Sequence, residues 1–381
     1  MKKKGALSGV NVLDISRLLP GPYCSMMLAD HGARVIAVEG GHSSGDMPFF
    51  DAVNRNKEHI SLNLKTEEGE KIFLRLAKKA DVIIEGFRPG VATRLGIDYK
   101  TVCGVNPGVI YCSITGFGQT GPRKNLPGHD VNYLGYAGIL DLIGESDRPP
   151  SIPGVQFADI SGGMAAANGV LLALFSREKT GEGQFIDISM TDNMVAFLPT
   201  VIFFSKFTGK NPRRSDEILS HGFACYNTYE TSDNRYITIG ALESKFWKAL
   251  CLCMNAPEYI PLQFDEERKI EIKKFMREKF AERTLAQWES ELVEVDACWG
   301  RTQNFSEVIS DESFIERGAI MEMKLKDGTS EKTIGVPIKL SKTPGSVRTP
   351  PAAFGEHTFS VLREFGYSKE RIEQFSKDGI I

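Results

Sequence analysis

Two side chains of the types that transfer protons stand 30 positions apart, His129 in a polar loop and Asp159 just before the pair Gly162-Gly163. An imidazole titrates near neutrality, so it can remove a proton or return one. A carboxyl group whose pKa is raised by a dry pocket can do the same work from the opposite side of a bound molecule. A third titratable group, Glu243, precedes a charge-rich stretch with helical character. These residues are our candidates for acid–base chemistry.

Each candidate also fits a purely structural role. Asp159 suits the cap of the helix predicted to follow it, and Ser161 suits the same position, which would leave Asp159 free. His129 fits an ordinary surface histidine. Glu243 fits an acid that complements the dipole of a helix start. Taken singly, the residues leave both roles open.

The elements that must position these residues alternate between strand and helix over the first 120 positions. This rhythm is typical of βαβ units and predicts a mostly parallel sheet. The predicted strands cover 10–15, 34–39, 81–85 and 109–113, and the predicted helices cover 22–30 and 65–80. A long apolar helix over 162–178 and a further strand over 184–189 complete the pattern.

Beyond about Thr191 the alternation ends. A β-hairpin is predicted over 226–239, with its turn at 232–234, and helical, charge-rich segments fill 243–315. We therefore expect an α/β protein with two domains. The large Rossmann-like domain combines 1–195 and 325–381, a linker covers 196–224, and a smaller α+β domain covers 225–324.

The composition excludes several classes of protein. A chain of 381 residues favours two domains, and a net charge of −3 gives no global field for nucleic acid. Seven cysteines at irregular spacing indicate neither a disulfide framework nor a metal site. The longest apolar run, 194–204, contains Pro199 and is too short to cross a bilayer. We expect a cytoplasmic protein that needs neither membrane nor metal.

The opening strand–helix–strand unit resembles the start of a nicotinamide-binding fold, but its first turn argues against that function. The turn over 16–22 holds one glycine and two prolines, so G-x-G-x-x-G is absent. Without those glycines the backbone cannot approach a pyrophosphate as that loop does.

A series of short motifs, in a fixed order along the chain, is more specific. The motifs are Leu19-Pro-Gly-Pro-Tyr-Cys24, Leu28-Ala-Asp-His-Gly-Ala-Arg-Val35, Ser61-Leu-Asn-Leu-Lys65, Glu85-Gly-Phe-Arg-Pro-Gly90, Arg94-Leu-Gly96, Gly116-Phe-Gly-Gln-Thr-Gly121, Gly128-His-Asp-Val-Asn-Tyr133, Ala158-Asp159, Lys179-Thr-Gly-Glu-Gly-Gln184 and, more weakly, Gly355-Glu-His357. Together they resemble the superfamily of family III CoA-transferases and α-methylacyl-CoA racemases (CaiB/BaiF-like). The resemblance implies a Rossmann-like large domain, a small domain and an interlocked homodimer.

Within that superfamily, several details resemble the racemase branch. These are Gly128-His129-Asp130, its spacing to Asp159, Glu243 at a position where racemases carry a carboxylate, and Asp296-Ala-Cys298. The resemblance implies that His129 and Asp159 invert a 2-methylacyl-CoA by moving its α-proton through an enolate. Glu243, from the same chain or its partner, would then hydrogen-bond His129. Backbone N–H groups over 161–163, at the expected helix start, would stabilise the enolate oxygen.

Coenzyme A would enter as part of the substrate, with no further cofactor. The resemblance assigns contacts with it to Leu62, Asn63, Leu64, Lys65, Gly86, Phe87, Arg88, Arg94, Gly128, Asp130, Val131, Asn132 and Tyr133. Arg88 and Arg94 suit phosphate because a guanidinium fork matches its oxygens. Racemases usually carry basic residues where this chain has Ala37 and Gly40, which leaves Arg34 or the Lys57 loop to compensate.

Two other functions stay open at this stage. In a type III CoA-transferase the same Asp159 attacks the thioester carbonyl and carries covalent acyl and CoA intermediates. The segment Pro153-Gly-Val-Gln-Phe157 resembles transferases rather than racemases. A CoA- or nucleotide-binding module without activity would explain the fold, but it gives the matched His, Asp and Glu no role.

Overall fold

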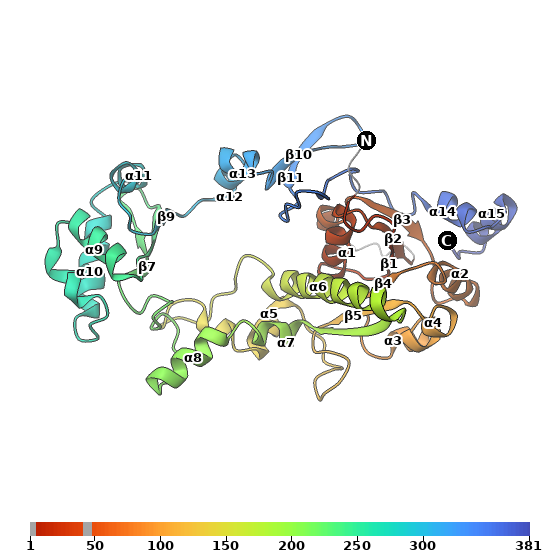
Figure 1. Ribbon diagram of the computed structural model, residues 1–381, viewed down its shortest axis with the longest axis horizontal. Helices are drawn as coiled ribbons and strands as arrows, with labels where there is room; N and C mark the ends of the chain where they lie inside the picture. The colour runs from red at the N-terminus through yellow and green to blue at the C-terminus, as the bar shows by residue number, and fades with distance from the viewer. Residues whose placement is uncertain (1–4, 41–47) are drawn as a thin grey trace. The chain divides into compact units, whose positions relative to one another are not determined.

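The computed structural model describes residues 5–40 and 48–381, and its chain divides into two compact units (Figure 1). Unit 1 comprises Met1–Ala137, Gly154–Phe197 and Asp311–Ile381, and unit 2 comprises Gly138–Pro153 and Leu198–Ser310. This division differs from the predicted ranges, because residues 138–153 belong to unit 2 and residues 311–324 belong to unit 1. Residues 198–224 of the predicted linker also belong to unit 2.

A six-stranded parallel sheet forms the centre of unit 1 and confirms the predicted α/β architecture. Its strand order is β3-β2-β1-β4-β5-β6, the order of a doubly wound fold. The strands are β1 (Asn11–Asp14), β2 (Arg34–Glu39), β3 (Lys57–Ser61), β4 (Val82–Glu85), β5 (Ile110–Thr115) and β6 (Gln184–Ser189). Strands β4 and β5 are buried throughout, as expected for central parallel strands covered on both faces.

Helices cover both faces of this sheet. The helices of this part of unit 1 are α1 (Pro20–Asp30), α2 (Glu67–Ala77), α3 (Val91–Arg94), α4 (Tyr99–Val105), α5 (Asp130–Tyr136), α6 (Phe157–Thr180) and α7 (Met190–Val195), with a 3-10 helix η1 over Pro48–Val53. Helix α1 begins with proline, whose fixed φ suits a first turn. Helix α2 begins where the Thr66 hydroxyl accepts the N–H of Gly69 at 3.0 Å.

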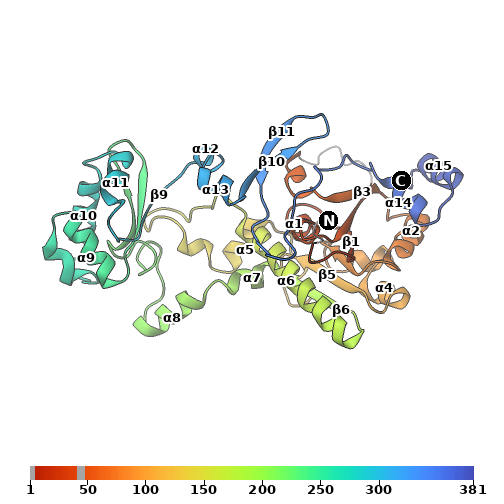
Figure 2. The same ribbon diagram turned by 45° about the horizontal axis from the view of Figure 1, so that its top comes forward.

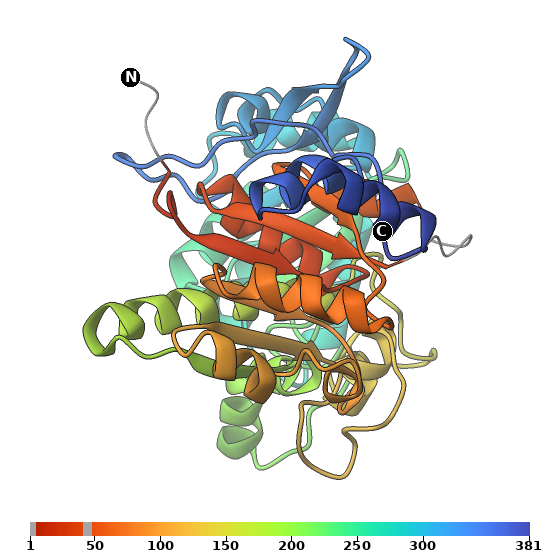
Figure 3. The same cartoon turned by 90° about the vertical axis from the view of Figure 1, so that its right-hand side faces the viewer.

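The C-terminal segment completes unit 1. It contains α13 (Glu312–Glu316), the antiparallel pair β10 (Ile320–Lys324) and β11 (Ser330–Ile334), α14 (Thr358–Glu364) and α15 (Lys369–Lys377). The blue helices α14 and α15 lie beside the sheet and α2 in Figure 3. Their side chains Leu362 and Phe375 share a core with Ile72 and Phe73 of α2. The C-terminal helices are therefore part of the core of the large domain.

Helix α6 is longer than predicted. It spans Phe157–Thr180, whereas the sequence indicated 162–178. Among the described residues it alone has the length and hydropathy of a membrane span, a test that core helices of other proteins also pass. Its small residues, including Gly163 and Ala166, are buried and let it pack closely on α1 and the sheet. Close packing accounts for the small residues on this face, whereas Leu171, Leu172 and Phe175 of the same helix are exposed.

Unit 2 combines helices with a three-stranded antiparallel sheet of order β7-β8-β9. Its elements are η2 (Leu140–Leu142), α8 (Pro199–Thr208), β7 (Tyr226–Glu230), β8 (Tyr236–Gly240), α9 (Ser244–Cys253), η3 (Pro257–Leu262), α10 (Lys269–Phe280), α11 (Leu285–Leu292), β9 (Trp299–Arg301) and α12 (Phe305–Val308). Helices α9, α10 and α11 gather on one side of the sheet (Figure 2), around a core that includes Trp247, Phe280 and Trp288. The predicted hairpin over 226–239 is confirmed.

Candidate active site

A cavity of about 470 Å³ opens in unit 1 where the carboxyl ends of the strands meet. Ligands of doubly wound folds bind at this edge of the sheet. The walls come from the turns after β1, β4 and β5 and from the first turns of α5, α6 and α7. They are formed by Arg17, Leu18, Pro20, Gly21, Gly86, Phe87, Arg88, Pro89, Ile114, Thr115, Gly116, Phe117, Lys124, Leu126, Pro127, Gly128, His129, Asn132, Tyr133, Asp159 and Met190.

His129 and Asp159 both line this cavity, from different helices. His129 is the exposed residue at the start of α5, and its backbone N–H donates to the side-chain oxygen of Asn132 at 3.0 Å. Asp159 lies in the first turn of α6 and is mostly buried. Burial, with the nearby Asp130 carboxylate adding to it, raises the pKa of Asp159 to about 6. This carboxyl group can therefore accept or donate a proton near neutral pH.

The start of α6 corrects three expectations. Asp159 does not cap the helix but follows Phe157 and Ala158 within it, and Ser161 lies inside the helix, where its hydroxyl donates to the carbonyl of Phe157 at 2.6 Å. The N–H groups over 161–163 are accordingly part of the helical ladder. They are not free donors at a helix start, so the predicted oxyanion site there is wrong.

The cap of α6 comes instead from Asp130. Its Oδ1 accepts the N–H groups of Ala158 at 2.7 Å and Asp159 at 3.1 Å. Asp130 follows His129 directly in the chain, so one carboxylate fixes the start of α6 next to the start of α5. It thereby positions both candidate catalytic residues.

Tyr133 forms a buried wall of the cavity between two glycines. Its hydroxyl donates to the carbonyl of Gly128, and its ring packs edge-on against Phe117. A Cβ atom would lie 2.4 Å from the Tyr133 ring at Gly116 and 2.7 Å from it at Gly128, so only glycine fits at either position. Burial and the charge of Asp159 raise the pKa of Tyr133 to about 12, which keeps the hydroxyl protonated.

The residues predicted to contact CoA divide into two groups. Gly86, Phe87, Arg88, Gly128, Asn132 and Tyr133 line the cavity. The others are outside its lining: Leu62, Asn63, Leu64, Lys65, Arg94, Asp130 and Val131. Leu62 is fully buried in the core, so its side chain cannot reach a ligand. Arg94 is exposed at the end of α3 and remains accessible to a ligand that extends beyond the cavity.

Two basic residues of the cavity were not predicted. Lys124 lies in the loop before α5, and Arg17 in the turn after β1 donates to the carbonyl of Gly40 at 3.1 Å. Next to Arg17, Leu18 lies in the left-handed region at φ 66°, an uncommon and strained conformation for a branched side chain. Isolated cations in loops have no periodicity, so only the unusual turn over 16–22 could have drawn attention to Arg17.

The two residues expected to replace a missing basic side chain are already engaged. Arg34 forms ion pairs with Glu58 at 2.8 Å and with Glu364 at 2.6 Å. Lys57 is buried and donates to the carbonyl of Pro22 at 2.9 Å. Arg17 and Lys124 provide the positive charge at the cavity instead.

Glu243 is the exposed residue at the start of α9 in unit 2, and its predicted contact with His129 stays a prediction. Asp296 and Cys298 also belong to unit 2. In the described part of the chain no three His, Cys, Asp or Glu side chains are grouped as metal ligands.

The cavity thus combines an imidazole, a carboxyl group with a pKa raised to about 6 and a basic rim, in a fold with the doubly wound strand order. The chain belongs to the CoA-transferase family III, whose model matches residues 7–358. It is an enzyme of this family and acts on acyl-CoA.

Relatives of both branches resemble it over almost its whole length. It is 36% identical to an alpha-methylacyl-CoA racemase of Homo sapiens, over 99% of this chain and 97% of the relative. It is 33% identical to a succinyl-CoA:mesaconate CoA-transferase of Haloarcula marismortui, over 95% of this chain and 97% of the relative. The crystal structure of a CaiB/BaiF family protein from Brucella suis matches with a TM-score of 0.82 and 30% identity, over 95% of this chain and 100% of that one.

Proposed function

We propose that this enzyme is a racemase of 2-methylacyl-CoA thioesters. The observation that carries the proposal is that an imidazole and a carboxyl group, held by the starts of two different helices, line one cavity. Inversion of a carbon next to a thioester needs a base on one face and an acid on the other. His129 and Asp159 are groups of the required kinds.

The reaction breaks the C–H bond at the α-carbon and leaves its electron pair in an enolate. One of the two groups takes the proton, and the other returns a proton to the opposite face. The raised pKa of Asp159, about 6, suits this exchange of roles, because the donor and acceptor forms are then both accessible near neutrality.

The CoA part of the substrate would lie against the turn Gly86–Arg88 and the first turn of α5. Arg17, Arg88 and Lys124 supply positive charge for its phosphates, since guanidinium and ammonium groups are the usual phosphate partners in proteins. The interlocked homodimer belongs to the same proposal, with Glu243 acting on His129 from its own or the partner chain.

Type III CoA transfer is the second candidate. It is favoured by the mostly buried position of Asp159 in the cavity, where its carboxylate could attack a thioester carbonyl, and by relatives with transferase names. In that reaction the Asp159 oxygen bonds to the acyl carbon and CoA leaves as a thiolate.

A covalent-labelling experiment separates the two reactions. The enzyme is incubated with a 2-methylacyl-CoA, treated with hydroxylamine and digested, and the peptide with Asp159 is weighed by mass spectrometry. Racemisation predicts an unmodified carboxyl group, with loss of optical purity in the recovered ester. A hydroxamate on Asp159, with inactivation, would assign the transferase reaction.

A further inference from the structure

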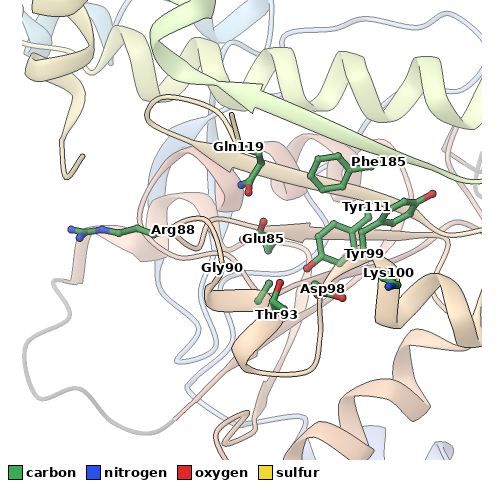
Figure 4. Close-up of a pocket in the computed structure, with 11 residues that line it drawn as sticks. Glu85, Arg88, Gly90, Thr93, Asp98, Tyr99, Lys100, Tyr111, Gln119 and Phe185 are labelled. Atoms are coloured by element: carbon green, nitrogen blue, oxygen red, sulfur yellow. The ribbon is translucent and has the colours of Figure 1, made fainter. Parts of the chain in front are cut away.

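A second, smaller cavity of about 310 Å³ lies behind the turn that follows β4. Figure 4 shows the Glu85 carboxyl at this cavity between Gln119 and Thr93, while the side chain of Arg88 points away from it. Glu85 is only 3% exposed. The acid–base chemistry proposed above gives no role to this buried carboxyl group.

Glu85 ends β4 beside two other polar residues of the sheet. In the register of the parallel strands it pairs with Ser113 of β5, which pairs with Asp187 of β6. The Ser113 side chain hydrogen-bonds Glu85 and accepts from Nε2 of Gln119 at 2.6 Å. The backbone N–H of Gln119 donates to Asp187 at 3.0 Å. These residues form a continuous row across three strands.

The row holds two loops that line the proposed substrate cavity. The Glu85 carboxylate accepts the N–H of Phe87 at 2.6 Å, which closes the turn Gly86–Arg88. Gln119 follows Gly116 and Phe117 in the loop after β5. Gly86, Phe87 and Arg88 form one wall of the cavity, and Gly116 and Phe117 form another. The row therefore lies behind both walls, and its residues are not among those that line the cavity with His129 and Asp159.

We propose that Glu85 is a positioning residue for acyl-CoA binding, whose carboxylate holds the Gly86–Arg88 turn in the conformation that receives the CoA part of the substrate. The assignment rests on the proposed function for the identity of the ligand. It also names a residue outside the acid–base pair whose charge state controls binding rather than the chemical step.

The charge of this carboxylate matters to the turn. Burial raises the pKa of Glu85 to about 7, with the Asp187 carboxylate adding to it and the bonds from Ser113 and Phe87 opposing it. The other titratable or charged groups at this site are Arg88, Asp98, Tyr99, Lys100, Tyr111 and Cys112. Above pH 7 the carboxylate accepts from both donors, and charge-assisted bonds of this kind are stronger than neutral ones. Protonation below pH 7 weakens them and loosens the turn.

The test uses Glu85→Gln, which keeps the shape of the side chain and removes its charge. Calorimetry measures the Kd of CoA from pH 6 to pH 8 in an Asp159→Asn background, which removes the titration of the carboxyl group that lines the substrate cavity. At each pH, the Kd with Glu85→Gln is divided by the Kd of the background protein without it. This ratio cancels any titration of CoA itself. We expect Glu85→Gln to weaken binding about tenfold at pH 8 and hardly at all at pH 6. Ser113→Ala should weaken it about threefold at pH 8.

Asp98→Asn is the matched control. It removes a carboxylate from the same second cavity that Glu85 lines, while asparagine still caps α4 by accepting the N–H of Thr101. Its Kd ratio should stay near one at every pH. A Glu85→Gln ratio that is near one throughout, or equally large at pH 6 and pH 8, would overturn the proposal.

Hydrogen exchange separates failure of this proposal from failure of the proposed function. In ligand-free protein at pH 8, the peptide containing Phe87 should exchange faster in Glu85→Gln than in wild type, with no change in Asp98→Asn. Equal exchange in wild type and both variants would refute the proposal that Glu85 holds the turn. If exchange is faster in Glu85→Gln but neither wild type nor any variant binds CoA, the proposed acyl-CoA function is refuted. The conclusion that Glu85 holds the turn would then stand by itself.

Discussion

The Asp130 carboxylate accepts the backbone N–H of Asp159 at 3.1 Å, 29 residues further along the chain. The same oxygen accepts the N–H of Ala158 at 2.7 Å, so it caps helix α6 from the start of α5. Because His129 precedes Asp130, this contact holds the backbone of His129 next to the start of α6. The charge of Asp130 also contributes to the raised pKa of Asp159.

Removal of this cap should destabilise the protein. Asp130→Ala leaves two N–H groups at the start of α6 without their partner, so we expect the free energy of unfolding to fall by about 1–2 kcal/mol. Asp130→Asn keeps an acceptor oxygen at the same place and should lose less than half of that. Denaturant unfolding at pH 7 measures both. Equal stability of Asp130→Ala and wild type would mean that the contact does not support α6.

The pH dependence of turnover should reflect Asp159. With a pKa of about 6, its basic form is lost below that pH, so kcat/KM in the direction that uses it as the base should decline there. Asp130→Asn removes the neighbouring charge, which should move this decline to lower pH. A rate profile from pH 4.5 to pH 8 tests the shift. An identical profile in the variant would show that Asp130 does not influence the titration.

The same titration should appear in protein stability. The pKa of Asp159 is higher in the folded protein, about 6, than the ordinary 3.8, so folding favours its neutral form. That stabilisation is complete below pH 3.8 and is lost as the pH rises through 6, at a cost of at most about 3 kcal/mol. Asp159→Asn should therefore be more stable than wild type at pH 8 and equally stable near pH 4. Thermal unfolding of both proteins across this range gives the comparison, and a pH-independent difference would contradict it.

Gly128, one of the two glycines against the Tyr133 ring, should not tolerate substitution. In Gly128→Ala the new methyl group would lie 2.7 Å from the buried ring, so the ring must move and the cavity wall with it. We expect a loss of about 1–3 kcal/mol and a higher KM for the acyl-CoA. Gly135→Ala is the control, because the space around that glycine of α5 is open, and alanine there should be neutral or stabilising. Similar effects of both substitutions would exclude the close approach as their cause.

Much of the fold could be predicted from the sequence because its signals are local. Short apolar runs between helical segments indicated the parallel sheet, and each predicted strand in 1–120 is present. The start of α6 was missed for the opposite reason. Gln156 makes no capping bond, and the capping carboxylate of Asp130 is distant in sequence, so no local pattern marks the helix start at Phe157.

The candidate site was predicted unevenly. The placement of His129 and Asp159 in one cavity followed from the family resemblance, since their spacing alone does not bring them together. Leu62 matched the family pattern, yet its side chain lies in the core. Arg17 lies in the turn over 16–22, where neither motif nor periodicity indicates a cation at the cavity.

Isotope exchange tests the central claim most directly. One enantiomer of a 2-methylacyl-CoA is incubated with the enzyme in D₂O, without an acceptor acid, and followed by mass spectrometry and chiral analysis. We predict deuterium at the α-carbon together with loss of optical purity, both slowed at least about 100-fold by His129→Ala and by Asp159→Asn. Recovery of the ester with its α-hydrogen and configuration intact, together with transfer of CoA to a carboxylic acid added in a parallel incubation, would contradict the racemase assignment.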